Sequence, residues 1–146
     1  MTYDIMLLRV LPGRTFDETL EEINSTLTVE QRADWDRLLQ RISREVGPVT
    51  TEEFPYSLTL WRDGPGGHLQ LDYDGDSANI DIPYRYPDSE ALPITAEAYR
   101  IGRMIEEECG LEGYDHEVEQ PVRTGDIDVA AARLGGIARW AQETLT

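Results

Sequence analysis

The sequence predicts an α+β fold, in which a mainly antiparallel sheet carries helices on one face and a single domain covers residues 1–146. Three observations lead to this fold class. Apolar residues alternate with polar ones across residues 54–84, which is the period of half-buried strands. Apolar residues at helical spacing occupy the segments before and after this region. The resulting order, β-α-α-β-β-β-α-β-α, is typical of a two-layer sandwich.

The first third of the chain predicts one strand and two helices. The apolar run 3–10 precedes a Leu-Pro-Gly turn and is expected to form a mostly buried strand. Residues 15–18 and 28–31 each fit a capping box, which predicts a short helix ending near Asn24 and a longer one ending at Gly47. The inward stripe of the longer helix consists of Trp35, Leu38, Leu39, Ile42 and Val46.

The middle of the chain predicts three strands joined by short loops, an antiparallel meander. The connections are glycine-rich at 63–67 and contain an Asp-Gly pair at 74–77. One face of these strands is expected to be apolar, and its residues are Phe54, Tyr56, Leu58, Leu60, Leu69, Leu71, Tyr73, Ile80, Ile82 and Tyr84.

The last third predicts two helices separated by a weak strand. Thr95 fits the N-cap of a helix that ends at Gly110. Residues 111–118 are expected to form a weak strand at a sheet edge. A final helix begins at residues 125–126, although its Gly135-Gly136 pair costs roughly 1 kcal/mol per glycine relative to alanine. Its inward residues would be Val129, Ala130, Leu134, Ile137, Ala141 and Leu145.

The charge of the chain is strongly and unevenly acidic. Asp and Glu number 29 against 13 basic residues, all of them Arg, and the formal net charge is −16. Residues 51–125 hold seventeen of the acids and five of the Arg. A surface of this kind attracts cationic partners and repels nucleic acid.

The composition also indicates the compartment. The longest apolar run, residues 5–8, is far shorter than a membrane span, and the N-terminus lacks the features of a signal peptide. The lone Cys109 excludes an internal disulfide. We therefore expect a cytoplasmic protein that does not associate with membranes.

Clustered acids and nearby aromatic residues form the candidate binding site. Asp residues at alternating positions 72, 74 and 76 could share one sheet face and steer a cationic partner. The same cluster could bind a divalent cation, but its spacing does not fit an EF-hand, and Asp-Gly is a favoured hairpin turn. We favour the turn and expect no metal. The residues predicted to contact a partner are Asp72, Asp74, Asp76, Asp81, Trp61 and Tyr84.

The residue types needed for catalysis are sparse. His116 follows Asp115, but no serine or cysteine lies in a strand-turn-helix elbow, and two histidines without a cysteine cluster do not indicate zinc. Cys109 follows three glutamates at a helix end, where a thiolate is disfavoured. We expect no cofactor and assign no catalytic residue. The competing hypothesis is a small-molecule or metal-binding domain, or an enzyme, that uses Asp81 with His68 in the groove between sheet and helices.

Two segments resemble small bacterial immunity proteins that accompany polymorphic toxins. They are the opening strand at residues 3–6 and the stretch from Ala98-Tyr99 to Gly110-Leu111-Glu112-Gly113-Tyr114-Asp115. The resemblance implies a protein that occludes a toxin and has no catalytic residues of its own. Together with the charge, it favours a non-enzymatic protein that engages a basic partner. Homodimerisation through residues 111–118 or the last helix is a further option.

Overall fold

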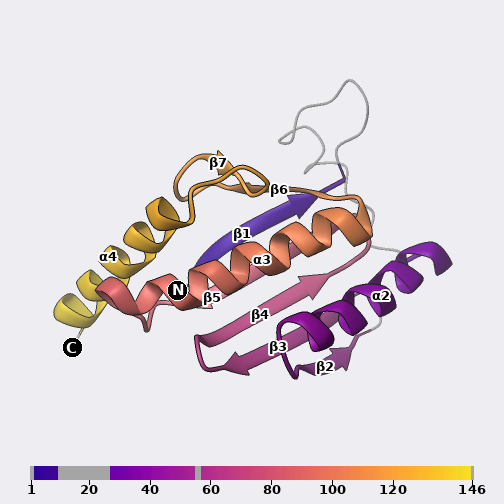
Figure 1. Ribbon diagram of the computed structural model, residues 1–146, viewed down its shortest axis with the longest axis horizontal. Helices are drawn as coiled ribbons and strands as arrows, with labels where there is room; N and C mark the ends of the chain where they lie inside the picture. The colour runs from indigo at the N-terminus through magenta and orange to yellow at the C-terminus, as the bar shows by residue number, and fades with distance from the viewer. Residues whose placement is uncertain (1, 10–26, 55–56, 146) are drawn as a thin grey trace.

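The structure, a computed structural model, describes residues 2–9, 27–54 and 57–145. It consists of one sheet with helices on one face (Figure 1), so the predicted α+β class is confirmed. The strands are β1 (Thr2–Leu8), β2 (Thr50–Glu53), β3 (Leu58–Gly64), β4 (Gly67–Tyr73), β5 (Ser77–Pro83), β6 (Glu112–Asp115) and β7 (Gln120–Pro121). The helical elements are α2 (Val29–Glu45), the 3-10 helix η1 (Asp88–Glu90), α3 (Ala91–Cys109) and α4 (Ile127–Leu145). No helix in these ranges combines the length and hydrophobicity that a membrane crossing requires.

Over the described residues, the sheet has seven strands in the order β2-β3-β4-β5-β1-β6-β7, and every neighbouring pair is antiparallel. The predicted meander is present as β3, β4 and β5. The first strand, β1, lies inside the sheet between β5 and β6. The strand expected at the edge over 111–118 is shorter and is not an edge strand, because β7 pairs with its outer side. The predicted helix over 15–24 falls outside the described residues.

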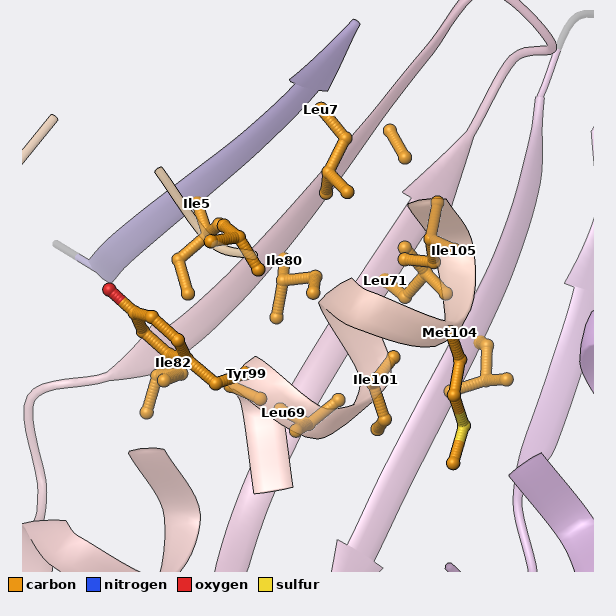
Figure 2. Close-up of a cluster of buried hydrophobic side chains, with 14 of the residues drawn as sticks. Ile5, Leu7, Leu69, Leu71, Ile80, Ile82, Tyr99, Ile101, Met104 and Ile105 are labelled. Atoms are coloured by element: carbon orange, nitrogen blue, oxygen red, sulfur yellow. The ribbon is translucent and has the colours of Figure 1, made fainter. Parts of the chain in front are cut away.

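The hydrophobic core lies between the sheet and α2 and α3. Alternate residues of the strands point toward the helices, and side chains of β1, β4 and β5 meet side chains of α3 (Figure 2). The strand residues of this layer are fully or almost fully buried, and they include Tyr3, Ile5, Leu7, Leu58, Leu60, Leu69, Leu71, Tyr73, Ala78, Ile80 and Ile82. The helices therefore fix which face of each strand is turned away from the core.

Helix α2 has the predicted N-terminus. The Thr28 hydroxyl accepts a hydrogen bond from the Gln31 amide at 3.1 Å, and the Gln31 side chain accepts one from the Thr28 amide at 2.9 Å. Trp35 is buried and stacks on Tyr73 of β4, with ring centroids 5.4 Å apart. The predicted inward stripe thus packs on the sheet.

Helix α3 begins earlier than the sequence predicts. Thr95 is fully buried inside the helix and does not cap it, because η1 leads directly into the first turn at Ala91. Pro93 is compatible with this start, since the amides of a first helical turn have no partner within the helix. The predicted end is confirmed, because Gly110 adopts the left-handed conformation of a C-cap, with φ of 68°.

Helix α4 forms despite its two glycines, and each glycine has a different environment. A Cβ at Gly135 would lie 2.5 Å from the carbonyl oxygen of Asp88, so the absence of a side chain lets α4 approach η1 closely. A Cβ at Gly136 would meet nothing within 4 Å. Val129 was expected to point inward, but its side chain is 48% exposed, because the buried face of α4 passes through Ala130 and Leu134.

An arginine occupies an inward position of β3 and joins three elements. Arg62 is 6% exposed, and its Nη1 and Nη2 donate to the carbonyl oxygens of Pro48 at 3.0 Å and Val46 at 3.3 Å. These carbonyls follow the end of α2, where backbone acceptors lack helical partners. The Nε atom of Arg62 also donates to Glu97 of α3 at 3.2 Å. Arg62 therefore connects the sheet to α3 through the ion pair and to the segment after α2 through the two carbonyls.

Candidate binding face

The sheet has a second face that α2 and α3 do not cover, and we call it the outer face (Figure 1). The strand register aligns its side chains in rows that cross the strands. One row consists of Asp4, Asp81, Gln70, Trp61 and Thr50. The neighbouring row consists of Met6, Asn79, Asp72, Thr59 and Glu52.

The outer face is acidic, and the described strands place no compensating arginine on it. Its carboxylates are Asp4, Glu52, Asp63, Asp72, Asp81 and Glu112. Within the described parts of the chain, none of these carboxylates has an arginine nitrogen within 4.0 Å. Where these groups are ionised, no arginine among the described residues therefore neutralises their charge.

The helix side differs, because several of its acids are paired with arginines. Arg41 of α2 lies 2.9 Å from Glu45, 3.3 Å from Glu107 and 3.4 Å from Glu108. The guanidinium of Arg41 holds the pKa of Glu45 below its ordinary value. The acidic run at the end of α3, which looks like part of one negative patch in the sequence, is thus largely compensated by α2.

Two carboxyl groups lie side by side at the centre of the outer face. Asp4 of β1 and Asp81 of β5 are directly opposite in the register, and they share a side-chain hydrogen bond. Burial raises the pKa of Asp81 to about 7, and the hydrogen bond and negative charge of Asp4 add to this effect. The Asn79 amide donates to Asp81 and opposes the rise, whereas the charge of Asp72 reinforces it. The pair therefore retains a proton near neutral pH.

A hydrogen-bonded network holds the neighbouring side chains in place. Asp72 accepts from the Thr59 hydroxyl at 2.7 Å and from the Gln70 amide at 3.0 Å. The same Gln70 side chain accepts from the Trp61 indole at 3.0 Å. Trp61 is partly exposed. The network therefore fixes a carboxylate and an aromatic ring in an orientation that a partner could recognise without reordering them.

The structure brings together some of the residues that the sequence predicts for the binding site. Asp72, Asp81 and Trp61 lie on the outer face, on β4, β5 and β3. Tyr84 follows β5, packs against the hydrophobic core and has its pKa raised mainly by burial. It lies beyond the end of the strand and is not part of the Trp61 row.

The remaining predicted acids occupy the turn between β4 and β5. Asp74 accepts from the amide of Ser77 at 2.7 Å and from its hydroxyl at 2.8 Å, as expected for a turn residue. Asp76 accepts from Gln31 of α2 at 2.9 Å and lies 3.6 Å from Arg9. Both carboxylates have partners within the fold, and the alternation along β4 does not extend to them.

The residues of the competing hypothesis do not lie in a groove between sheet and helices. Asp81 and His68 are both on the outer face, and the space under α3 is filled by the core (Figure 2). Over the ranges that the structure describes, no group of three or more His, Cys, Asp or Glu side chains is arranged to hold a metal ion. Cys109 is buried, and burial raises the pKa of its thiol to about 12, as the sequence led us to expect for a packing residue.

Asp115 belongs to a buried polar cluster, and His116 is exposed. The Asp115 carboxylate accepts from the hydroxyls of Tyr3 at 2.6 Å and Tyr99 at 2.5 Å. Gln120 donates to the Tyr99 hydroxyl at 2.8 Å. These bonds attach β6 and β7 to β1 and α3, so the role of the carboxylate is to position this end of the sheet.

Several acids of the outer face were not predicted from the sequence as binding residues. Asp4 alternates with the apolar residues Tyr3 and Ile5, and this period-two pattern could have indicated an outward carboxylate. Glu52 and Glu112 lie in strands too short to give such a pattern. Their position next to the other acids depends on the strand order, which no local pattern determines.

Comparison with protein-family models, with curated proteins and with solved structures finds no match to this chain. The functional argument therefore depends on the geometry and charge of the outer face.

Proposed function

We propose that this protein binds a basic protein partner through the outer face of its sheet. One observation carries the proposal: the described strands place their outward carboxylates together on a face whose strand positions contain no arginine. The ion pairs of the described residues involve other acids, on the helices, on the loops and on the inward side of β2. The negative field of this face is thus available to a cationic surface.

The chemistry of the face suits protein recognition. Unpaired carboxylates accelerate the encounter with a positively charged partner, and this effect weakens as salt screens the charges. Trp61 adds apolar area, and its indole is already held by Gln70. Aromatic side chains of this kind are frequent among the residues that contribute most to binding energy.

A toxin domain is the partner class that the resemblance to polymorphic-toxin immunity proteins supports. An immunity protein of this type acts by covering its toxin, so it needs a complementary surface rather than a reactive group. The acidic outer face would provide that surface to a basic toxin domain.

The test compares two double variants of equal charge. Asp63→Asn with Asp72→Asn removes two charges from the outer face. Asp36→Asn with Glu143→Gln removes two charges from exposed positions on α2 and α4. Asp81 is left unchanged because its carboxyl group holds a proton near neutral pH.

Each variant and the wild type are immobilised and exposed to lysate of the host cell at low salt. A basic protein that the wild type and the helix variant retain and the outer-face variant loses would support the proposal. Its purified form should then bind more weakly as NaCl rises from 0.05 to about 0.5 M, where screening acts within a few ångströms. Equal retention by all three proteins, or binding that is insensitive to salt, would contradict the proposal.

A further inference from the structure

The strand β2 forms an open edge of the sheet. All four of its residues are exposed, and β3 is its only neighbour in the strand order among the described residues. In Figure 1, β2 is the outermost strand on its side of the molecule. An edge strand presents backbone N–H and C=O groups that can pair with a further strand.

The hydrogen-bond phase of β2 identifies the backbone groups that are available. Phe54 donates its amide to the Ser57 carbonyl at 2.8 Å, at the end of the ladder between β2 and β3. Bonded and non-bonded pairs alternate along antiparallel strands, so Glu52 also bonds to β3. The N–H and C=O groups of Thr51 and Glu53 therefore point away from β3, toward the open edge.

The opposite edge of the sheet is closed. Pro121 of β7 has no N–H to donate. The amide of the next residue, Val122, donates to Gly113 at 3.0 Å, so by the same alternation the backbone groups of Pro121 are the ones that face away from β6. The carbonyl oxygen of Pro121 lies against Gly125, where an added Cβ would be 2.6 Å from it. The two edges of the sheet therefore differ. The sequence of β2 contains no proline, and no described side chain hydrogen-bonds to the β2 backbone.

We propose that the β2 edge accepts an extended, basic segment of the partner protein, which adds to the sheet as an additional strand. The charge of β2 selects this occupant over a second copy of the chain. If two β2 strands paired antiparallel through Thr51 and Glu53, Glu52 of one copy would lie directly opposite Glu52 of the other. Like charges in that position destabilise a strand pair, whereas a lysine or arginine opposite Glu52 stabilises it.

This proposal rests on the proposed function and names the conformation of the partner. Glu52 lies in the same outer-face row as Thr59 and Asp72. A basic side chain opposite Glu52 would therefore extend this row and approach the unpaired carboxylates. The backbone of Thr51 and Glu53 would hold the segment, and the outer face would select its charge.

The experiment uses the full chain and a capped nine-residue peptide of alternating lysine and threonine. Two further versions of the peptide carry N-methyl groups on the odd or on the even residues. A strand that adds to an edge bonds through every second residue, so only one N-methylated version should bind at least fivefold more weakly than the unmodified peptide.

In the complex, the amides of Thr51 and Glu53 should become protected from hydrogen exchange. Thr51→Pro removes one outward N–H and should weaken binding by a similar factor.

Other results separate this proposal from the proposed function. In one such result, the lysine peptide binds and the Asp63→Asn, Asp72→Asn double variant abolishes binding, but N-methylation and Thr51→Pro have no effect. The outer face would then bind cations without strand addition. That result would overturn the edge proposal alone. Equal binding of a glutamate-threonine peptide would overturn both. The Thr51 amide could instead be protected from hydrogen exchange without peptide, with a sedimentation coefficient that rises with protein concentration. That result would identify a second copy of the chain as the occupant and overturn the proposal of a basic segment.

Discussion

Replacing Asp81 by asparagine should stabilise the protein at alkaline pH. The carboxyl group lies opposite Asp4 on the outer face, and burial and its acidic neighbours raise its pKa from 3.8 to about 7. In the unfolded chain the group is expected to return to its ordinary pKa. An asparagine amide can donate to Asp4 as the protonated carboxyl group does, and it does not ionise.

The direction follows from the raised pKa. The folded state binds the Asp81 proton more tightly than the unfolded state, so this contribution to stability is complete below pH 3.8 and is lost as pH rises through about 7. For an isolated, fully buried group, the loss between pH 5 and pH 7 would reach about 1.4 kcal/mol for each pH unit. Because the group is only partly buried and shares its proton with Asp4, we expect a total of about 2 kcal/mol between pH 5 and pH 8.

Urea unfolding of wild type and Asp81→Asn at pH 5, 6, 7 and 8 measures this difference directly. The variant should gain stability relative to the wild type with each step, up to about 2 kcal/mol at pH 8. Asp4→Asn is the companion variant: it removes the neighbouring charge and should reduce the pH dependence of the wild-type protein. A difference between wild type and Asp81→Asn that stays constant from pH 5 to pH 8 would refute the shared-proton interpretation.

Two further predictions concern the helix side of the sheet. Arg62→Ala should cost about 3–5 kcal/mol in urea unfolding, because it leaves the largely buried Glu97 carboxylate without its partner. A loss below about 1 kcal/mol would show that the ion pair does not join the layers. Gly135→Ala and Gly136→Ala should have opposite effects on the melting temperature. The first places a Cβ against the Asp88 backbone and should cost about 1–3 kcal/mol, whereas the second meets open space and should gain up to about 1 kcal/mol. Equal shifts would contradict the close contact of α4 with η1.

Local patterns in the sequence predicted the elements that local chemistry determines. The capping box at Thr28 and Gln31 depends only on residues three apart, and both of its hydrogen bonds are present. The meander of β3, β4 and β5 follows from period-two alternation and from turns such as the one that Asp74 closes. Gly110 ends α3 because a left-handed residue at a helix C-cap favours glycine.

Local patterns could not predict the contacts between segments that are distant in the sequence. Thr95 looked like an N-cap, but packing draws it into the helix and moves the helix start to Ala91. The candidate site shows the same limit. Asp72 and Asp81 belong to one hairpin and could be placed together, whereas the position of Asp4 opposite Asp81 requires β1 to insert next to β5. That strand order arises from the packing of the whole sheet.

The Asp4–Asp81 pair also connects stability with the proposed function. Two adjacent carboxyl groups on a partly exposed face do not stabilise the fold near neutral pH, since an asparagine at position 81 would avoid the repulsion between their charges. A cation from a partner would remove that repulsion, and binding would then favour the ionised form of Asp81. By linkage, the affinity of the complex should increase as pH rises through about 7, and a proton should be released when the complex forms near that pH.

Once the partner is purified, calorimetry at pH 6.5 in two buffers of different ionisation enthalpy measures this proton release. Asp81→Asn should abolish it, and unchanged release by that variant would show that the proton comes from another group.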